Sequence, residues 1–280
     1  MSFLKKIEEN NNYKEEDKTP FLIEGKRVGQ VRSDYLEYVL SSEIFVFEKG
    51  VITLLEELKT FDERTQALIL FAKKALLDGI CNRFMNENYP LLEKGSNEPL
   101  AFIDRSISTL LGSLSFGQHL NAYVMTSEGM KMWIGRRAYD KPHHSGKLDQ
   151  LVAGGLPWDI NPIENLKKEC YEEAGMSESL ASEAKSVGLV SYKYEYEQGG
   201  KEDIIYCYDI ELNEDFVPNC TDGEVEEFYL MPIEKVSEIV RTTNEFKTNC
   251  NLVIIDFLLR HGFIGVEDDD YIEIAQGLRS

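Results

Sequence analysis

The chain has 280 residues, of which 42% are apolar, and this length suits one large domain or two of ordinary size. Its 30 basic and 50 acidic side chains give a formal net charge of −20, which argues against nucleic acid or an anionic membrane surface as a partner. The sequence shows neither a signal-peptide pattern nor an apolar run of about 18 residues, so we expect a cytoplasmic protein.

The first part of the chain predicts a small α+β domain, which we assign to residues 20–112. Residues 1–19 are rich in Lys, Glu and Asn, and we expect them to be disordered. A polar, glycine-containing stretch, 90–99, is the expected border region, although residues 102–112 could belong to either side of it. The predicted elements are a hairpin over 21–31 turning at Glu24-Gly25-Lys26, a helix over 34–40, strands over 44–47 and 51–54, a helix over 62–79 and a strand-like element over 81–92.

The second part, residues 113–280, predicts a larger α/β domain. The acidic run at 267–270 lacks the spacing of a calcium-binding loop and predicts a solvated segment. The predicted elements are strands over 120–125, 131–134, 151–153, 187–196, 204–212 and 224–231, and helices over 162–174, 232–241 and 248–261.

The helix over 162–174 has clear signals at both ends. Pro162 suits a first helical turn, Asn161 is the expected N-cap, and Gly175 is the expected C-cap. Apolar side chains recur at spacings of three and four and predict an inward stripe made by Ile163, Leu166, Cys170 and Ala174.

Another face of this helix carries Glu169, Glu172 and Glu173, which are neighbours at spacings of three and four. Like charges this close repel, and the helix dipole disfavours them further near the C-terminal end. Such a cluster is either a solvated acidic face or a cation site. Because all its ligand atoms are oxygens, it favours Mg²⁺ or Mn²⁺ over zinc.

The five cysteines include no C-x-x-C pair and none has a metal-binding spacing. We expect reduced thiols that pack in the interior, as in a reducing compartment.

The segment 152–176 resembles the signature of the Nudix hydrolases, which reads glycine, five residues, Glu, seven residues, then Arg-Glu-apolar-x-Glu-Glu-x-Gly-apolar. Gly154 fits the first glycine, and residues 168–176 fit the end. Lys168 stands in place of the Arg, and Ile160 in place of the upstream Glu unless Asp159 or Glu164 substitutes. The resemblance implies an α/β/α sandwich with a mixed sheet, preceded by the small α+β domain.

Further motifs lie around this signature, at Ile103-Asp104-Arg105, 117–123, 133–137, Lys141, 145–149, 152–155, 222–226, Asn249-Cys250 and 256–262. Together they resemble one Nudix branch, which also occurs fused to thiamine pyrophosphokinase. The resemblance implies a diphosphatase that hydrolyses thiamine diphosphate and its oxidised oxo and oxy forms to the monophosphate and phosphate.

The resemblance also implies roles for individual residues. Glu169, Glu172 and Glu173 would hold Mg²⁺, the Gly154 carbonyl would complete its shell, and Lys168 would orient a carboxylate. Either Glu224 or Glu226 would supply a further ligand. The expected substrate-binding residues are Arg136, Arg137 and Lys141 for phosphate oxygens, Trp158 for ring stacking, and Gly155 and Asn121.

Two alternatives stay open. The chain could hydrolyse another nucleoside diphosphate derivative or an isoprenoid diphosphate, or it could be a binding module with weak catalysis, because Ile160 leaves one signature carboxylate missing. The expected partner is in each case a small molecule, and the protein would be a monomer or a homodimer.

Overall fold

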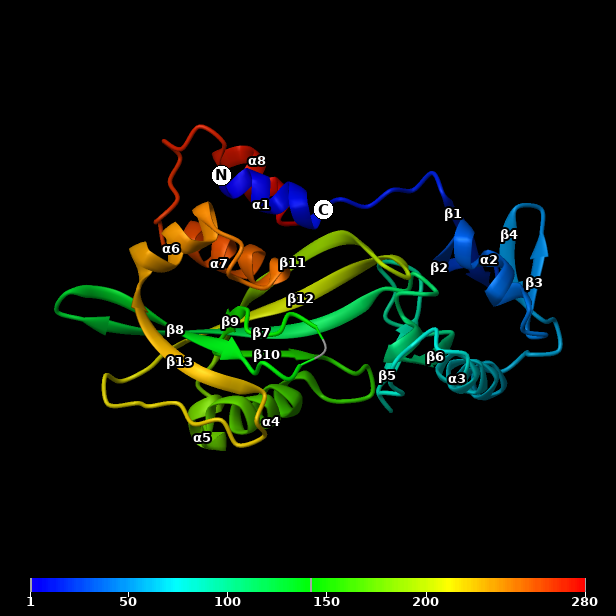
Figure 1. The fold of residues 1–280 in the computed structure, drawn as a ribbon, viewed down its shortest axis with the longest axis horizontal. Coiled ribbons are helices and arrows are strands. Elements are labelled where there is room, and N and C mark those ends of the chain that lie inside the picture. Colours follow the sequence, from blue (N-terminus) through cyan, green and yellow to red (C-terminus); the bar gives the residue numbers. More distant parts are fainter. Residues whose placement is uncertain (1, 142, 280) are drawn as a thin grey trace.

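The computed structural model describes residues 2–141 and 143–279. Two bodies lie side by side in Figure 1, with the first part of the chain at the right and the second part, including both chain ends, at the left. In the described residues no helix is both long and apolar enough to cross a membrane.

The first body is an α+β unit, as the sequence predicted. Its main sheet has four strands in the order β2-β1-β4-β3, and β5 and β6 form a separate two-stranded sheet. The chain reverses direction tightly between β1 and β2 because Glu24 and Gly25 both take positive φ angles, 53° and 77°. Its elements are β1 (Lys18–Ile23), β2 (Lys26–Arg32), α2 (Ser33–Leu40), β3 (Phe45–Glu48), β4 (Val51–Leu54), α3 (Phe61–Leu77), β5 (Asn88–Leu91), β6 (Ala101–Asp104) and a 3₁₀ turn at Arg105–Ile107.

The second body is built on a mixed seven-stranded sheet with the path β11-β12-β7-β8-β13, to which β10 adds on β7 and β9 adds on β8. The β12–β7 pair is parallel and the other pairs are antiparallel. Its elements are β7 (Ser115–Thr126), β8 (Gly129–Arg137), β9 (Leu148–Gln150), β10 (Val152–Gly155), α4 (Pro162–Ala174), α5 (Glu178–Ala181), β11 (Lys185–Tyr196), β12 (Gly199–Glu211), β13 (Val225–Pro232), α6 (Ile233–Thr242), α7 (Thr248–Arg260) and α8 (Tyr271–Gly277).

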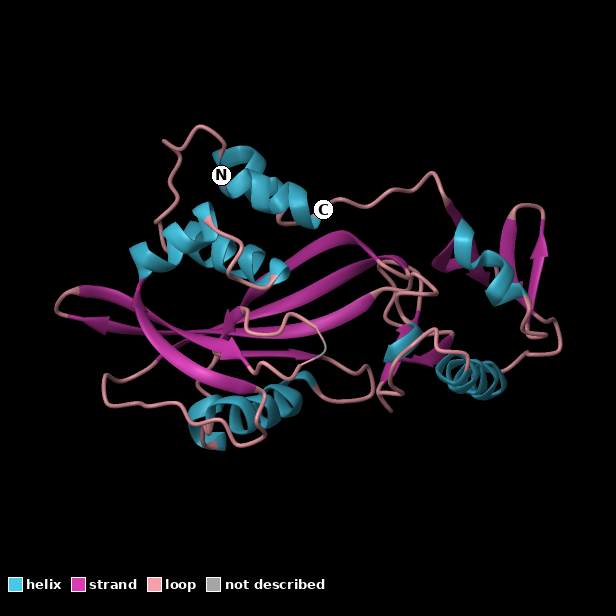
Figure 2. Ribbon diagram, viewed as in Figure 1, coloured by secondary structure: helices cyan, strands magenta, loops and turns pink. Residues whose placement is uncertain are grey.

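Helices cover both faces of this sheet, which confirms the predicted α/β/α sandwich (Figure 2). One hydrophobic cluster joins the sheet to α6 and α7, and a second joins it to α4 and α5. The two-sided burial explains why β7 is apolar or buried along most of its length rather than alternating.

The expected disorder of residues 1–19 is wrong for residues 3–10. These residues form α1 (Phe3–Asn10), which lies against α7 and α8 in Figure 1. The Ile7 side chain is buried in the core of the second body, and the Asn10 amide donates to the Thr248 carbonyl at 3.1 Å. Burial against a distant helix therefore orders a segment that is too polar to predict an ordered element by itself.

The expected border at 90–99 is also wrong. Pro90 and Leu91 belong to β5, which pairs with β6, and the hydrophobic core of the first body extends to Leu111. Within 81–92 only Asn88–Leu91 is a strand. The helix α8 was not predicted, because the acidic run before it hides its short apolar pattern.

Candidate active site

The acidic helix α4 begins and ends where the sequence predicts. The Asn161 side chain accepts the N–H of Ile163 at 2.9 Å, and Gly175 closes the helix in the left-handed conformation at φ 64°. Of the predicted stripe, Leu166, Cys170 and Ala174 are buried, whereas Ile163 is 45% exposed.

Asn165, rather than the predicted Ile163, is the buried residue near this end of α4. Its amide donates to the Gln118 side chain at 2.9 Å and to the Gly155 carbonyl at 3.2 Å. A polar side chain can lie inside here because its hydrogen bonds are satisfied. These bonds tie the first turn of α4 to β7 and to the glycine turn.

Glu173 is the most deeply placed of the three carboxylates. It is 6% exposed and accepts the backbone N–H of Ala153 at 2.8 Å. The pKa of its carboxyl is raised to about 8, chiefly by burial; the charges of Asp149, Glu169 and Glu224 also raise it, and the Ala153 N–H lowers it. Among the described residues, Glu173 itself forms no salt bridge, and the Ala153 N–H is its hydrogen-bond donor.

Glu169 lies directly over the glycine turn. A Cβ atom at Gly154 would come within 2.9 Å of the Glu169 carboxyl carbon, so a larger residue there would displace this carboxylate. Burial is the main cause that raises the pKa of Glu169. Glu172 is less buried, and Lys168 bridges the two, with its Nζ 3.0 Å from Glu172 Oε2 and 3.4 Å from Glu169 Oε1. Lys168 therefore forms ion pairs with two carboxylates of the cluster.

The backbone oxygen expected as a metal ligand is the wrong one. Gly154 pairs with Gln118, and its carbonyl faces β7, where a Cβ at Gly117 would lie 3.2 Å from it. Alternate residues of a strand direct their backbone groups to opposite sides. The N–H of Ala153 points to Glu173 on the free edge of β10, so its carbonyl points there too. Ala153, not Gly154, presents its oxygen to the acidic cluster.

Of the two candidate ligands at the later strand, Glu224, which directly precedes β13, lies nearer the cluster. Its charge acts on both Glu169 and Glu173, and Lys141 holds it with an ion pair of 2.9 Å. Glu226 is exposed at a bulge of β13. Through its ion pair with Glu224, Lys141 is a partner of the acidic cluster and also places a cation near it.

This arrangement fits a hard divalent cation. The carboxylates of α4, the Ala153 carbonyl and Glu224 offer oxygen ligands only, and Glu173, the most buried of these carboxylates, forms no salt bridge among the described residues. Lys168, the cation paired with it, is 56% exposed at its side chain. The residues present therefore fit Mg²⁺ or Mn²⁺.

A second group of possible ligands, His119, Asp149 and Cys250, is buried next to this cluster. Asp149 already has Arg137 at 3.3 Å and Lys247 at 3.5 Å, and the Cys250 thiol donates to it at 2.7 Å. Burial raises the pKa of that thiol well above its usual range. With two cations on its carboxylate and a protonated thiol, this group is a hydrogen-bonded core cluster rather than a metal site.

Three of the predicted substrate-binding residues are engaged elsewhere. Asn121 is fully buried and donates to Asp209, a partner of Arg260, so it is wrong as a substrate contact. Arg136 donates to the Tyr229 hydroxyl at 3.0 Å and the Gly146 carbonyl at 2.8 Å, which fixes the loop before β9. Arg137 is held by Asp149.

The loop between β10 and α4 is packed rather than open. The Trp158 ring lies 5.2 Å from that of Phe116, which gives it a packing role. Asp159 accepts the Asn88 amide at 2.8 Å, and Glu164 pairs with Lys167 on the exposed side of α4. Neither therefore substitutes for the carboxylate missing at Ile160.

Asn88 and Arg105 were not assigned a role from the sequence. Both come from the first body, yet they contact the glycine turn and the loop after it. Arg105 belongs to a motif that carries the family resemblance, but its distance along the chain from the signature gives no local signal of contact.

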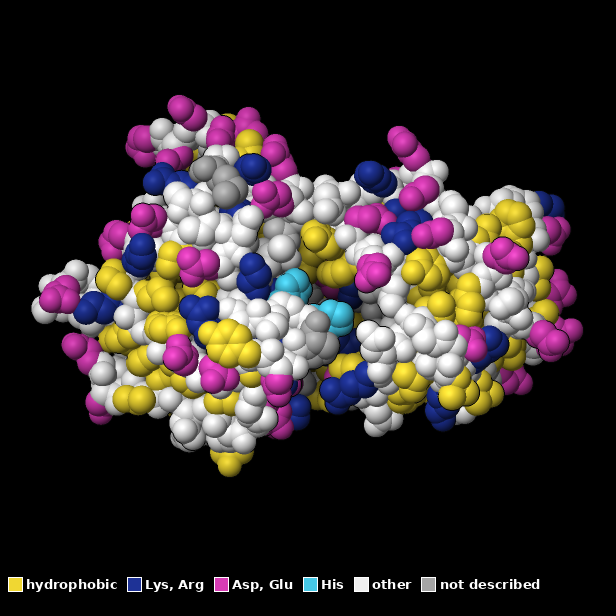
Figure 3. All heavy atoms as spheres, in the orientation of Figure 1, with side chains coloured by type: hydrophobic (Ala, Val, Ile, Leu, Met, Phe, Trp, Pro, Cys, Tyr) yellow, Lys and Arg dark blue, Asp and Glu magenta, His cyan; other side chains and the backbone are white. Residues whose placement is uncertain are grey.

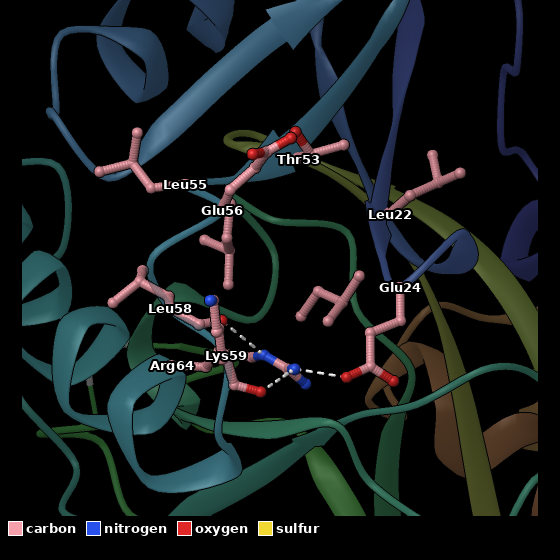
Figure 4. A pocket seen from close by; sticks show the side chains of 10 residues that line it. Leu22, Glu24, Thr53, Leu55, Glu56, Leu58, Lys59 and Arg64 are labelled. Atoms are coloured by element: carbon pink, nitrogen blue, oxygen red, sulfur yellow. Dashed lines mark hydrogen bonds and ion pairs between the residues drawn. The ribbon is translucent and has the colours of Figure 1, made fainter.

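The described residues also enclose a cavity of about 370 Å³ in the first body, bordered by β1, β4 and the start of α3 (Figure 4). Its one deeply buried charged side chain, Arg64, is occupied by Glu24 and by the carbonyls of Leu58 and Lys59. With these partners satisfied, Arg64 has a structural role. The cavity is separate from the acidic cluster.

Family models match both parts of the chain. Residues 2–114 match a family model described as a domain of unknown function (DUF4743), and residues 117–249 match the NUDIX domain. The chain is 41% identical over 272 residues to Nudix hydrolase 20, chloroplastic, of Arabidopsis thaliana, covering 93% of this chain and 72% of that protein. It is 40% identical to Nudix hydrolase 24, chloroplastic, of the same plant, covering 99% and 78%. Among solved structures, the NUDIX domain of Shewanella oneidensis NrtR aligns at a TM-score of 0.42 with 10% identity, covering 53% of this chain and 89% of that one.

Proposed function

The chain belongs to the Nudix hydrolase family, and from this premise we propose that it is a Mg²⁺-dependent diphosphatase whose substrates are thiamine diphosphate and its oxidised forms. As a hydrolase of this family it acts on diphosphates. The proposal depends on one observation: two carboxylates of α4 lie against β10. Glu169 lies over Gly154, and Glu173 accepts the Ala153 N–H at the free edge of the strand.

A diphosphate resists attack by water because its oxygens are already anionic. When bound, a divalent cation neutralises that charge and lowers the pKa of a water molecule. The chain's own part is to hold the ligand oxygens in place. The Ala153 N–H fixes the Glu173 carboxylate, Lys168 fixes Glu172, and Gly154 leaves room for Glu169. One carboxylate of this coupled group accepts the proton of the attacking water.

In the proposed reaction, water adds to one phosphorus atom and the bridging P–O bond breaks. Thiamine monophosphate and inorganic phosphate leave as products. Support for thiamine as the organic part comes from the resemblance of the segments around the signature to the thiamine-associated branch. The structure brings two of these segments, at Arg105 and at Glu224, to the glycine turn and the acidic cluster.

A panel of diphosphates tests the substrate. With Mg²⁺ present, we expect kcat/KM to be highest for oxo-thiamine diphosphate, then thiamine diphosphate, and lower for ADP-ribose and isopentenyl diphosphate. Phosphate or monophosphate release is the readout, and Glu172→Gln is the inactive control. Much faster cleavage of a nucleoside diphosphate derivative or an isoprenoid diphosphate would overturn the thiamine assignment while leaving the hydrolase intact.

One observation favours a second candidate, a binding module with weak catalysis. Ile160 is 39% exposed at the position of a signature carboxylate, and Asp159 and Glu164 are engaged elsewhere. Calorimetric binding of a diphosphate by the wild type, with turnover no faster than in Glu172→Gln, would support this candidate over the enzyme.

A further inference from the structure

An arginine of the first body reaches the glycine turn from the side opposite α4. Successive side chains of a strand point to opposite faces, so Gly154 faces Glu169 while Gly155 faces the other way. A Cβ atom on Gly155 would lie 2.5 Å from Nη1 of Arg105 and 2.8 Å from the Tyr89 hydroxyl. The guanidinium group therefore lies on the bare backbone of Gly155.

Arg105 is held in position but retains free donors. Glu87 accepts from its Nη1 at 3.0 Å, and the Tyr89 ring lies 5.7 Å from its guanidinium carbon. Among the described residues, Glu87 is the one hydrogen-bond acceptor of this side chain, which has five N–H groups. Its side chain is 38% exposed, so a ligand can reach the others.

Arg105 stays charged in this position. Burial opposes its charge, yet the nearby Tyr89 hydroxyl and the Glu87 and Asp203 carboxylates hold its pKa above the usual range. Tyr89 is itself fixed, since its hydroxyl donates to the Phe116 carbonyl at 3.3 Å. The cation is thus preorganised rather than free to swing into solvent.

The same part of the first body also holds the loop that follows the glycine turn. The Asn88 carbonyl accepts the Trp158 N–H at 2.9 Å, and the Asn88 amide donates to Asp159 at 2.8 Å. The space-filling view shows the two bodies in contact along a hollowed seam, with histidine side chains beside it (Figure 3). The first body is therefore connected directly to the loop of the site.

We propose that Arg105 binds a phosphoryl oxygen of the substrate's diphosphate, so that the first body completes the active site. Ala153, which presents its carbonyl to the acidic cluster, and Gly155 are two residues apart, about 7 Å along a strand. A diphosphate held by a cation at the cluster therefore lies within reach of the guanidinium, which suits phosphoryl oxygens. This inference rests on the proposed diphosphatase function but not on thiamine as the organic part.

Binding of methylenediphosphonate, which has no hydrolysable bridge and no organic group, tests the inference in the full chain. With Mg²⁺ present, calorimetry should show the Kd of Arg105→Ala raised about 10- to 100-fold over the wild type. Arg105→Lys should fall between them, because it keeps the charge but not the planar fork. Arg27→Ala, which removes an exposed arginine of the same body, is the matched control and should bind like the wild type.

Activity gives an independent readout on whichever diphosphate the wild type cleaves best. The kcat/KM of Arg105→Ala should fall about as much as its affinity does, and millimolar guanidinium should restore part of it. An unchanged Kd and kcat/KM in folded Arg105→Ala would overturn the inference. If Arg105→Ala does not fold, wild-type values in Arg105→Lys would overturn it. If no thiamine compound is cleaved but the Arg105 effects persist on another diphosphate, the thiamine proposal fails and this one stands.

Discussion

The carboxylate of Glu173 accepts the backbone N–H of Ala153 at 2.8 Å, which joins the acidic helix to the free edge of β10. This bond places Glu173, the most buried acid of the signature, beside the edge of β10 where the Ala153 carbonyl faces the cluster. Burial is the main cause that raises the pKa of Glu173 to about 8, and this hydrogen bond acts in the opposite direction.

Replacing Glu173 with Gln should abolish most of the hydrolysis. The amide oxygen can still accept the Ala153 N–H, but the negative charge that holds a divalent cation is gone. We expect kcat to fall by at least about 10²-fold in initial-rate assays with Mg²⁺, with a melting temperature equal to or above that of the wild type. Glu164→Gln, on the exposed side of the same helix, is the control that should keep its activity. Wild-type rates in Glu173→Gln would remove α4 as the catalytic centre.

The variants Glu224→Gln and Glu226→Gln should show which of these two carboxylates is the further metal ligand, a choice that the sequence left open. Only Glu224 lies close enough for its charge to act on Glu169 and Glu173. We expect Glu224→Gln to raise the Mg²⁺ concentration needed for half-maximal activity by about tenfold or more, and Glu226→Gln to leave it unchanged. Metal titrations of activity measure this. A large effect of Glu226→Gln and none of Glu224→Gln would show that Glu226, and not Glu224, is the ligand.

Lys168→Met should lower kcat/KM by about tenfold, because Lys168 holds Glu172 and Glu169 in a common orientation. Lys168→Arg should keep wild-type activity or exceed it, since the planar guanidinium can reach both carboxylates. Lys167→Met is the matched control, because the ion pairs of Lys167 within the described part of the chain are with Glu164 and Glu178, away from the cluster. Equal rates in both methionine variants would show that the bridge has no part in catalysis.

His119 should make the stability of the protein depend on pH below neutrality. Burial, and then the charges of Lys247 and Arg137, lower its pKa from 6.5 to about 4 against the opposing effects of Asp149 and Gln150. The unfolded chain therefore binds this proton first. The stabilisation from the neutral His119 side chain is fully present above pH 6.5. It is lost as the pH falls towards 4, which lowers the free energy of unfolding by roughly 3 kcal/mol.

Urea unfolding between pH 4 and pH 7 measures this dependence. His119→Gln removes the titrating group but keeps a donor for Gln150, which accepts from His119 Nδ1 over 2.7 Å. We expect the stability of the variant to fall less steeply over this range. The same slope in both proteins would assign the acid sensitivity to other groups.

Much of the fold followed from local pattern. The helix α4 has the predicted bounds because a capping Asn, a proline in the first turn and a left-handed Gly are all local signals. The hairpin at Glu24-Gly25 and most strands of the second body were likewise predicted, and the mixed sheet agrees with the family resemblance. These features depend on neighbours within a few residues or on a long signature.

The sequence by itself determined that three carboxylates share one helical face and that a glycine turn precedes them. Only the tertiary structure decided that Ala153 rather than Gly154 presents its carbonyl to them, that Asn121 is buried in an ion network, and that α1 is ordered. It also brought Arg105 onto Gly155. The physical reason is that strand register and packing between distant segments set which way a group faces, and neither leaves a periodic trace in the sequence.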